Sequence, residues 1–176
     1  AGSYTITASV NDSDGVWNAN PQAVTVNAQP VFTIAGEPSV NERAAYTLSL
    51  SPSDPGRTVT GWTINWGDGS AVQAVSGSPS SVTHTYALGP HNYAITASAT
   101  DDTGGSYVAN SMAVSVMHVP PMVNIWDAGT ATSPYTLGLS ESDPGHAIQG
   151  WAINWGDGSP VQSVTGNPAS VTHPYA

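Results

Sequence analysis

Apolar and polar residues alternate along most of this chain, and short runs of turn-forming residues interrupt the alternation. A period of two predicts half-buried β-strands, because successive side chains of a strand point to opposite faces of its sheet. We expect no helix longer than about one turn, since no segment carries a helical stripe. The pattern predicts seven strands between residues 30 and 119, at 31–34, 45–50, 61–66, 71–75, 81–85, 92–99 and 106–116.

Turn chemistry separates these predicted strands, as in Ser53-Asp-Pro-Gly56 and Asp101-Asp-Thr-Gly-Gly105. Seven short strands spaced in this way are typical of an immunoglobulin-like sandwich of two antiparallel sheets. Strand parity places one apolar face on each strand, and we expect these faces to form the core. The residues concerned include Tyr46, Leu48, Leu50, Trp62, Ile64 and Trp66.

A long segment of the chain occurs twice. Residues 46–87 and 135–176 align without a gap, and about 29 of the 42 positions are identical. The segment Tyr4–Ser9 likewise matches Tyr93–Ser98, again displaced by 89 residues. A period of this size is too long for a solenoid unit and suits one small β-domain per repeat.

The phase of the repeat predicts how the chain divides. Residues 1–29 correspond to the last two strands of one domain, 30–119 to a complete domain, and 120–176 to the front part of a further domain. We expect 120–176 and 1–29 to complete one another across adjacent copies, with Ala176 of one copy next to Ala1 of another. The copies are either periods of one long chain or separate subunits of a head-to-tail filament.

Composition narrows the range of partners. The formal charge is −10, and Arg43 and Arg57 are the only strong bases. Nucleic acid is therefore not an expected partner, because almost nothing here neutralises phosphates. The absence of cysteine excludes disulfides and thiolate metal sites. No apolar run approaches the roughly 18 residues that a membrane span needs, so we expect no membrane insertion in this segment.

The sequence Trp66-Gly-Asp-Gly69, followed by His84-Thr-Tyr86 and Tyr93-Ala-Ile-Thr-Ala97, resembles the PKD domain family. Trp155-Gly-Asp-Gly158 with His173-Pro-Tyr175 repeats the pattern, so the resemblance covers essentially the whole chain. It implies an all-β fold of tandem immunoglobulin-like, PKD-type β-sandwich domains. It further implies an extracellular or cell-surface location and a spacer, adhesin stalk or surface-layer role without enzymatic activity.

Several residues of the repeated motif are expected to be structural. An Asp between two glycines favours a turn in which its carboxylate accepts backbone N–H bonds, with metal ligation as the alternative. A catalytic histidine needs a nucleophile or an acid as partner, and a His-x-Tyr pair by itself supplies neither. We therefore expect the histidine to be structural, near a corner where the tyrosine hydroxyl pins a loop. The residues are Trp62, Trp66, Asp68, His84, Tyr86, Trp151, Trp155, Asp157, His173 and Tyr175.

Calcium is the one cofactor that the sequence raises. Asp54 and the pair Asp101 and Asp102 lie in two loops at the same end of the predicted sandwich, and a hard cation prefers several oxygen ligands. Some PKD-type domains bind calcium at that end. The competing interpretation is solvated turn acids, because the other copy has Asp12 and Asp14 in a different spacing.

Three functions compete at this point. The first is a structural repeat of an extracellular filament, stalk or surface layer, whose partners are other copies of the chain. The second is an adhesin that binds cell-surface glycans, to which exposed Trp17 and Trp126 could contribute. The third is a non-catalytic spacer of a secreted enzyme. Near-identical copies favour the first, and the lack of a paired acid and base or a nucleophile elbow predicts no enzyme.

Overall fold

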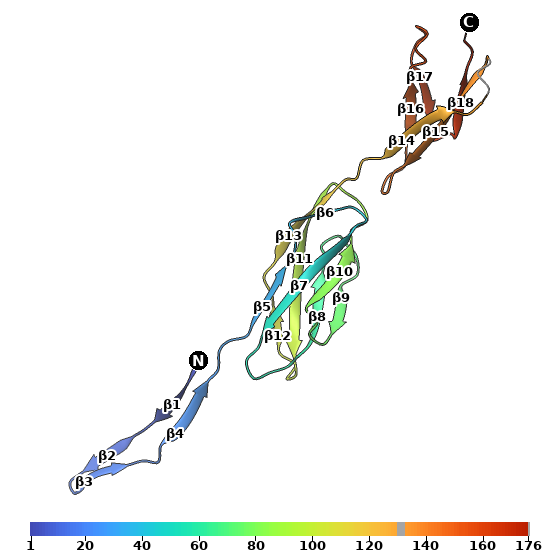
Figure 1. Ribbon diagram of the computed structural model, residues 1–176. Coiled ribbons are helices and arrows are strands. Elements are labelled where there is room, and N and C mark those ends of the chain that lie inside the picture. Colours follow the sequence, from blue (N-terminus) through green and yellow to red (C-terminus); the bar gives the residue numbers. More distant parts are fainter. Residues whose placement is uncertain (130–132, 176) are drawn as a thin grey trace. The chain divides into compact units, whose positions relative to one another are not determined.

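The computed structural model of the protein describes residues 1–129 and 133–175. Every regular element in these ranges is a β-strand (Figure 1), which confirms the predicted all-β class. None of the described residues forms a helix long and apolar enough to cross a membrane. The chain divides into two compact units, one made of residues 1–36, 48–82 and 94–112, the other of 37–47, 83–93 and 113–176.

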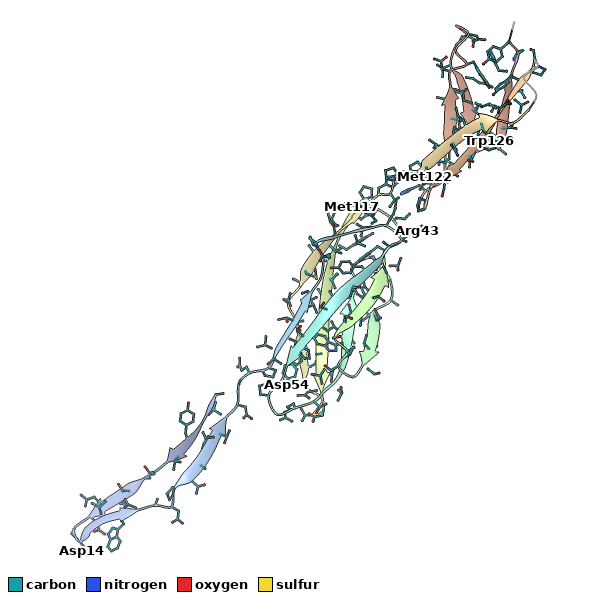
Figure 2. All side chains as sticks on the ribbon, in the orientation of Figure 1. Asp14, Arg43, Asp54, Met117, Met122 and Trp126 are labelled. Atoms are coloured by element: carbon teal, nitrogen blue, oxygen red, sulfur yellow. The ribbon has the colours of Figure 1, made fainter. Side chains whose placement is uncertain are left out.

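The first unit begins with a long hairpin, residues 1–29, that we call the N-terminal hairpin. Its strands are β1 (Gly2–Ile6), β2 (Ser9–Asp12), β3 (Gly15–Asn18) and β4 (Gln22–Val26), with β1 paired to β4 and β2 to β3. Asp14 marks the tip in Figure 2, and the Asp12 side chain accepts the N–H groups of Asp14 and Gly15 there. Sequence predicted two strands, but each arm is interrupted once, and Pro21 in the second gap has no N–H for the ladder.

Residues 30–119, which we call the middle copy, hold nine strands. They are β5 (Val31–Ala35), β6 (Ser39–Asn41), β7 (Ala45–Ser53), β8 (Val59–Asn65), β9 (Gln73–Ser76), β10 (Ser81–Thr85), β11 (His91–Asp101), β12 (Ser106–Val108) and β13 (Met112–Met117). One sheet has the order β10-β7-β5, and the other has the order β6-β13-β11-β8-β9, with β12 paired to β11.

The core of the middle copy lies on the faces that strand parity predicts. The buried apolar residues are Phe32, Ile34, Tyr46, Leu48, Leu50, Val59, Trp62, Ile64, Trp66, Tyr86, Ile95, Ala97, Ala99, Ala109, Val114 and Val116. Phe32 packs edge-on against Trp62 with ring centroids 5.8 Å apart, and it stacks on Tyr107 at 5.1 Å. Burial of such rings removes large apolar areas from water and supplies much of the stability of a sandwich this small.

Two features of the middle copy differ from the prediction. The segment predicted as one strand over 106–116 is two strands, because Asn110 between them bonds through its side chain to Ile34. The Asn110 Oδ1 accepts the Ile34 N–H at 2.8 Å, and its Nδ2 donates to the Ile34 carbonyl at 3.0 Å. The short strand β6, parallel to β13 in register Val40 with Val116, was not predicted. Three residues are too few to show a period.

The second unit includes residues 120–176, which we call the C-terminal segment. Strands β14 (Met122–Asp127), β15 (Tyr135–Ser142) and β18 (Ser170–His173) form one sheet, and β16 (Gly150–Ile153) and β17 (Gln162–Thr165) form another. Leu139, Ile153 and Trp155 make a small buried cluster. Trp126 of β14, labelled in Figure 2, lies over Gly138, where a Cβ atom would collide with the indole.

The repeated sequences produce the same local hydrogen bonds. In the middle copy the Leu50 N–H donates to the Ser80 carbonyl at 2.9 Å, and in the C-terminal segment the Leu139 N–H donates to the Ala169 carbonyl at 2.9 Å. The Trp66 indole donates to the Gln73 side chain at 2.9 Å, as Trp155 does to Gln162 at 2.8 Å. Equivalent residues can therefore be compared position by position.

Candidate functional site

The Gly-Asp-Gly turn and the His-x-Tyr motif meet in the C-terminal segment. His173 Nε2 donates to Asp157 Oδ2 at 2.7 Å, and its ring stacks on Trp155 with centroids 4.6 Å apart. The Tyr175 hydroxyl donates to the Trp155 carbonyl at 3.0 Å. Hydrogen bonds from Ser159 and then from His173 hold the pKa of Asp157 well below its ordinary value. The arrangement pins a turn.

The same motif residues in the middle copy also lie in structural surroundings. Trp66 and Tyr86 are buried, and Tyr86 stacks on Tyr93 with centroids 5.0 Å apart. His84 contacts the Tyr86 ring edge-on at 4.7 Å. Asp68 Oδ1 accepts the backbone N–H of Ser70 at 3.0 Å, which closes the turn.

The two remaining tryptophans of the predicted set occupy equivalent positions. Trp62 is buried, and its indole nitrogen has no hydrogen-bond partner. Trp151 is partly buried and donates to the Asn167 side chain at 3.1 Å. Trp62 therefore lies in the core of the middle copy, and Trp151 packs against the buried cluster of the C-terminal segment, on the faces that their strand parity predicts.

Asp101 organises the loop between β11 and β12. Its Oδ1 accepts the N–H and hydroxyl of Thr103 at 2.8 and 2.7 Å and the N–H of Gly105 at 2.8 Å. Its Oδ2 accepts the Tyr107 hydroxyl at 3.1 Å. These bonds, the Thr103 hydroxyl foremost, lower the pKa of Asp101 to about 2 against the opposing effect of desolvation. Asp101 is thus a buried carboxylate with both oxygens engaged.

The other two members of the predicted calcium set have different surroundings. Asp102 is exposed. Asp54, labelled in Figure 2, carries a buried Oδ2 atom that has no hydrogen-bond partner. A cation could use that oxygen. Calcium binding by Asp54 with Asp101 or Asp102 stays a prediction.

The N-terminal hairpin exposes side chains that the middle copy buries. Ile6 is 58% exposed, whereas Ile95, its equivalent, is fully buried. Val26 is 49% exposed, whereas the equivalent Val116 is fully buried. Trp17 is also exposed. It lies opposite Val10 in the hairpin, as Tyr107 lies opposite Ala99 in the middle copy, so Trp17 is the equivalent of Tyr107. The hairpin therefore presents an apolar face whose equivalent is buried in the middle copy.

The C-terminal segment shows the complementary exposure. Strands β14 and β15 pair in the same register as β5 and β7, so Val123 corresponds to Phe32 and Ile125 to Ile34. Val123 and Ile125 are 64% and 62% exposed, whereas Phe32 and Ile34 are 5% and 3% exposed. This sheet also exposes apolar side chains whose equivalents are buried in the middle copy.

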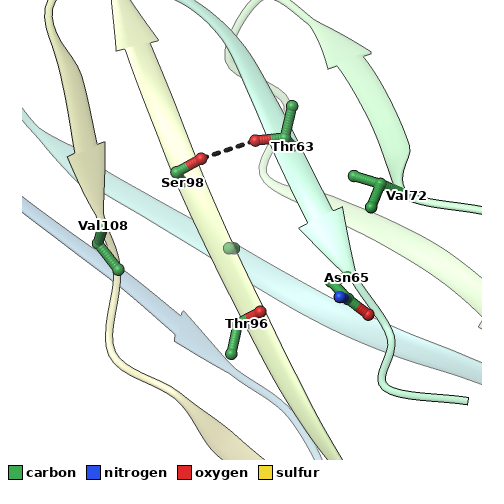
Figure 3. A pocket seen from close by; sticks show the side chains of 7 residues that line it. Thr63, Asn65, Val72, Thr96, Ser98 and Val108 are labelled. Carbon is green, nitrogen blue, oxygen red and sulfur yellow. Dashed lines mark hydrogen bonds between the residues drawn. The ribbon is translucent and has the colours of Figure 1, made fainter.

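A shallow hollow lies on the outer face of β8 and β11 (Figure 3). It measures about 280 Å³ and is lined by Thr63, Asn65, Val72, Thr96, Ala97, Ser98 and Val108. The hydroxyls of Thr63 and Ser98 share a hydrogen bond of 2.7 Å across it. None of the lining side chains ionises, so the hollow offers no acid or base.

Glu42 is a buried carboxylate that the sequence analysis missed. It lies between β6 and β7, and its Oε2 accepts the Gly89 N–H at 2.7 Å. Its Oε1 accepts the Val119 N–H at 2.8 Å and lies 2.8 Å from His118 Nδ1. The Val119 N–H, then that of Gly89, lower the pKa of Glu42 to about 2. No repeated motif contains Glu42, so the sequence offered no signal for it.

Comparison with known proteins identifies the family. The family model described as the PKD domain matches residues 27–116, which is just over half of the chain. The chain belongs to the PKD domain family. PKD domains are typically non-catalytic modules and commonly occur in extracellular or surface proteins. Nothing among the curated proteins is detectably similar to this PKD chain.

Solved structures also resemble the chain. The PKD domain of an M14-like peptidase from Thermoplasmatales archaeon SCGC AB-540-F20 is 21% identical, with a TM-score of 0.43. The match covers 52% of this chain and 99% of that one. The fibronectin(III)-like modules of Clostridium thermocellum CbhA are 20% identical, also with a TM-score of 0.43. That match covers 66% of this chain and 63% of the other.

Proposed function

We propose that this chain is a structural repeat of an extracellular filament, stalk or surface layer. In this assembly the N-terminal hairpin of one copy completes the sandwich that the C-terminal segment of another copy begins. The observation that carries the proposal is the matched exposure of two apolar faces whose equivalents are buried in the middle copy. We propose no catalytic role.

The register of the proposed contact follows from the middle copy. There β8 pairs with β11, with Ile64 opposite Ala97 and Thr63 opposite Ser98. The equivalents of β8 and β11 are β16 in the C-terminal segment and β1 with β2 in the hairpin. The proposed contact therefore places Ile153 opposite Ala8, and Ala152 opposite Ser9.

Burial supplies the driving force for this contact. Fully burying one Val, Leu or Ile side chain stabilises by about 1.5–3 kcal/mol. Ile6, Val24, Val26, Val123 and Ile125 are exposed together with Trp17. An unpaired strand edge beside such residues also favours addition of another strand. The position of Trp17 at the place of Tyr107 supports a packing role for this ring over a glycan platform.

A pair of engineered cysteines tests the register. The chain has no cysteine of its own. Residues directly opposite in an antiparallel pair lie within disulfide range. We therefore expect Ser9→Cys with Ala152→Cys to form intermolecular disulfides on mild oxidation. Non-reducing electrophoresis of the oxidised protein would then show multiples of 18.0 kDa that collapse on reduction.

The matched control combines Ser9→Cys with Thr47→Cys, because Thr47 is exposed on β7 and is not opposite Ser9 in the proposed register. The control should give at most a weak dimer band. Equal ladders in both variants, or a monomer in both, would contradict the proposed assembly. Denaturing electrophoresis of natural material separates one long covalent chain from separate subunits. The seam at Ala176 lies outside the described residues and stays a prediction.

A further inference from the structure

Three side chains from distant parts of the sequence converge within the second compact unit. Glu42 lies between β6 and β7, His118 follows β13, and His146 lies between β15 and β16. Glu42 Oε1 is 2.8 Å from His118 Nδ1 and 3.9 Å from His146 Nδ1. The three potential ligand atoms all lie within 4.8 Å of one another. The two imidazole rings meet edge to face with centroids 4.8 Å apart.

We propose that Glu42, His118 and His146 form a binding site for a divalent transition-metal ion, Zn²⁺ in the first place. Two imidazole nitrogens and one carboxylate oxygen are a donor set that suits zinc. Ligand atoms of a tetrahedral zinc site are about 3.3 Å apart, as follows from bond lengths of about 2.0–2.1 Å. His146 has to approach Glu42 by a fraction of an ångström, and His118 has to withdraw from Glu42 by about as much. The widest pair of ligand atoms, up to 4.8 Å apart, has to close by up to about 1.5 Å through rotation of the partly exposed imidazoles.

The surroundings hold the carboxylate ready for this role. The N–H groups of Val119 and Gly89 fix the two oxygens of Glu42, and such outer contacts orient metal ligands. The remaining lone pair of Oε1 points to His118. When the ion enters, His118 takes the tautomer with its proton on Nε2, exchanged through solvent, so that the Nδ1 lone pair turns to the metal. Gly145 packs so closely on Glu42 that a Cβ there would lie 2.7 Å from Oε2.

The charge and exposure of the cluster also suit a cation. Asp143 Oδ1 lies 3.8 Å from His146 Nδ1 and adds a second negative charge beside the site. The Glu42 side chain is fully buried, whereas His118 and His146 are partly exposed. Solvent therefore reaches the imidazole side, where a water would take the fourth position of the ion.

The repeat predicts one such site for each chain. In the alignment of the copies, His146 corresponds to Arg57, and His118 corresponds to Ala28. Neither replacement binds zinc, so the site is confined to one place in the repeat. A bound ion would join three segments that are far apart in sequence and would stiffen this part of the protein. This site does not depend on the assembly proposed above.

Calorimetric titration of the 176-residue chain with zinc chloride tests the proposal. We expect one ion per chain, and we expect His118→Gln and His146→Gln each to weaken binding at least about tenfold. His91→Gln is the matched control, because His91 is exposed and lies outside the cluster. It should bind zinc as the unmodified chain does. Circular dichroism of each variant verifies that the fold is retained.

Cobalt provides a second measurement. Co²⁺ in place of Zn²⁺ should give the intense visible absorption of a tetrahedral site, and this band should disappear in the double variant His118→Gln/His146→Gln. Zinc should also raise the melting temperature of the unmodified chain, because the ion binds only the folded state. Equal zinc affinity in the double variant and the unmodified chain would overturn the proposal, as would the absence of both heat and cobalt absorption.

Discussion

Ile95 and Ile6 occupy equivalent positions of the repeat, and they form a matched pair for a mutational test. Ile95 is fully buried in the middle copy, whereas Ile6 is 58% exposed in the N-terminal hairpin. Ile95→Ala should destabilise the middle copy by about 2–5 kcal/mol, as truncation of a buried isoleucine does. Ile6→Ala should change the stability of the unassembled chain by less than about 0.5 kcal/mol.

The melting temperature converts these energies into a measurement. A domain of this size shifts by about 4–8 °C for each kcal/mol, so Ile95→Ala should lower the midpoint by at least about 8 °C. Urea unfolding followed by tryptophan fluorescence gives the free energies directly, with Trp62 and Trp66 as buried reporters. Under conditions of assembly, Ile6→Ala should become costly as well, because Ile6 then takes the environment of Ile95. Equal and small effects of both substitutions would refute the reasoning.

Three further predictions concern the middle copy. Trp66→Ala should cost about 3–5 kcal/mol, because the ring is buried, and an unchanged melting temperature would exclude a core role. The pKa of Asp101 is lowered to about 2 in the folded protein. The ionised carboxylate therefore stabilises the fold fully above the ordinary Asp pKa of about 4, and this stabilisation is lost as the pH falls from about 4 towards 2. Asp101→Asn should flatten the acid dependence of the melting temperature in that window. If Asp54 with Asp101 or Asp102 binds calcium, excess chelator should lower the melting temperature, and identical melts would exclude it.

Period-two alternation predicted most of the middle copy. It placed Leu48, Leu50, Ile64 and Ile95 on the faces that prove to be buried. Such prediction succeeds because the side chains of a strand alternate regardless of what the strand packs against. The repeat itself is also a property of sequence alone, and it led to the comparison of equivalent positions on which the assembly proposal depends.

Other features had no signal along the chain. The division of the predicted strand at 106–116 depends on a side-chain contact between Asn110 and Ile34, which are 76 residues apart. The hydrogen bonds of Asp101 to Thr103 and Gly105 join residues close together in one turn, so the turn sequence could have predicted them. The burial of its carboxylate was not, because burial depends on what the fold places around a turn.

The sequence by itself determined most of the strands of the middle copy, their buried faces and the phase of the repeat, because these follow from local periodicity and turn chemistry. Only the tertiary structure brought Glu42 to His118 and His146. It also showed that the same side chain is buried in one copy and exposed in another. The exposure of a side chain and the geometry of a set of ligands depend on which distant segments pack together. The alternation of apolar and polar residues within one strand does not specify those contacts.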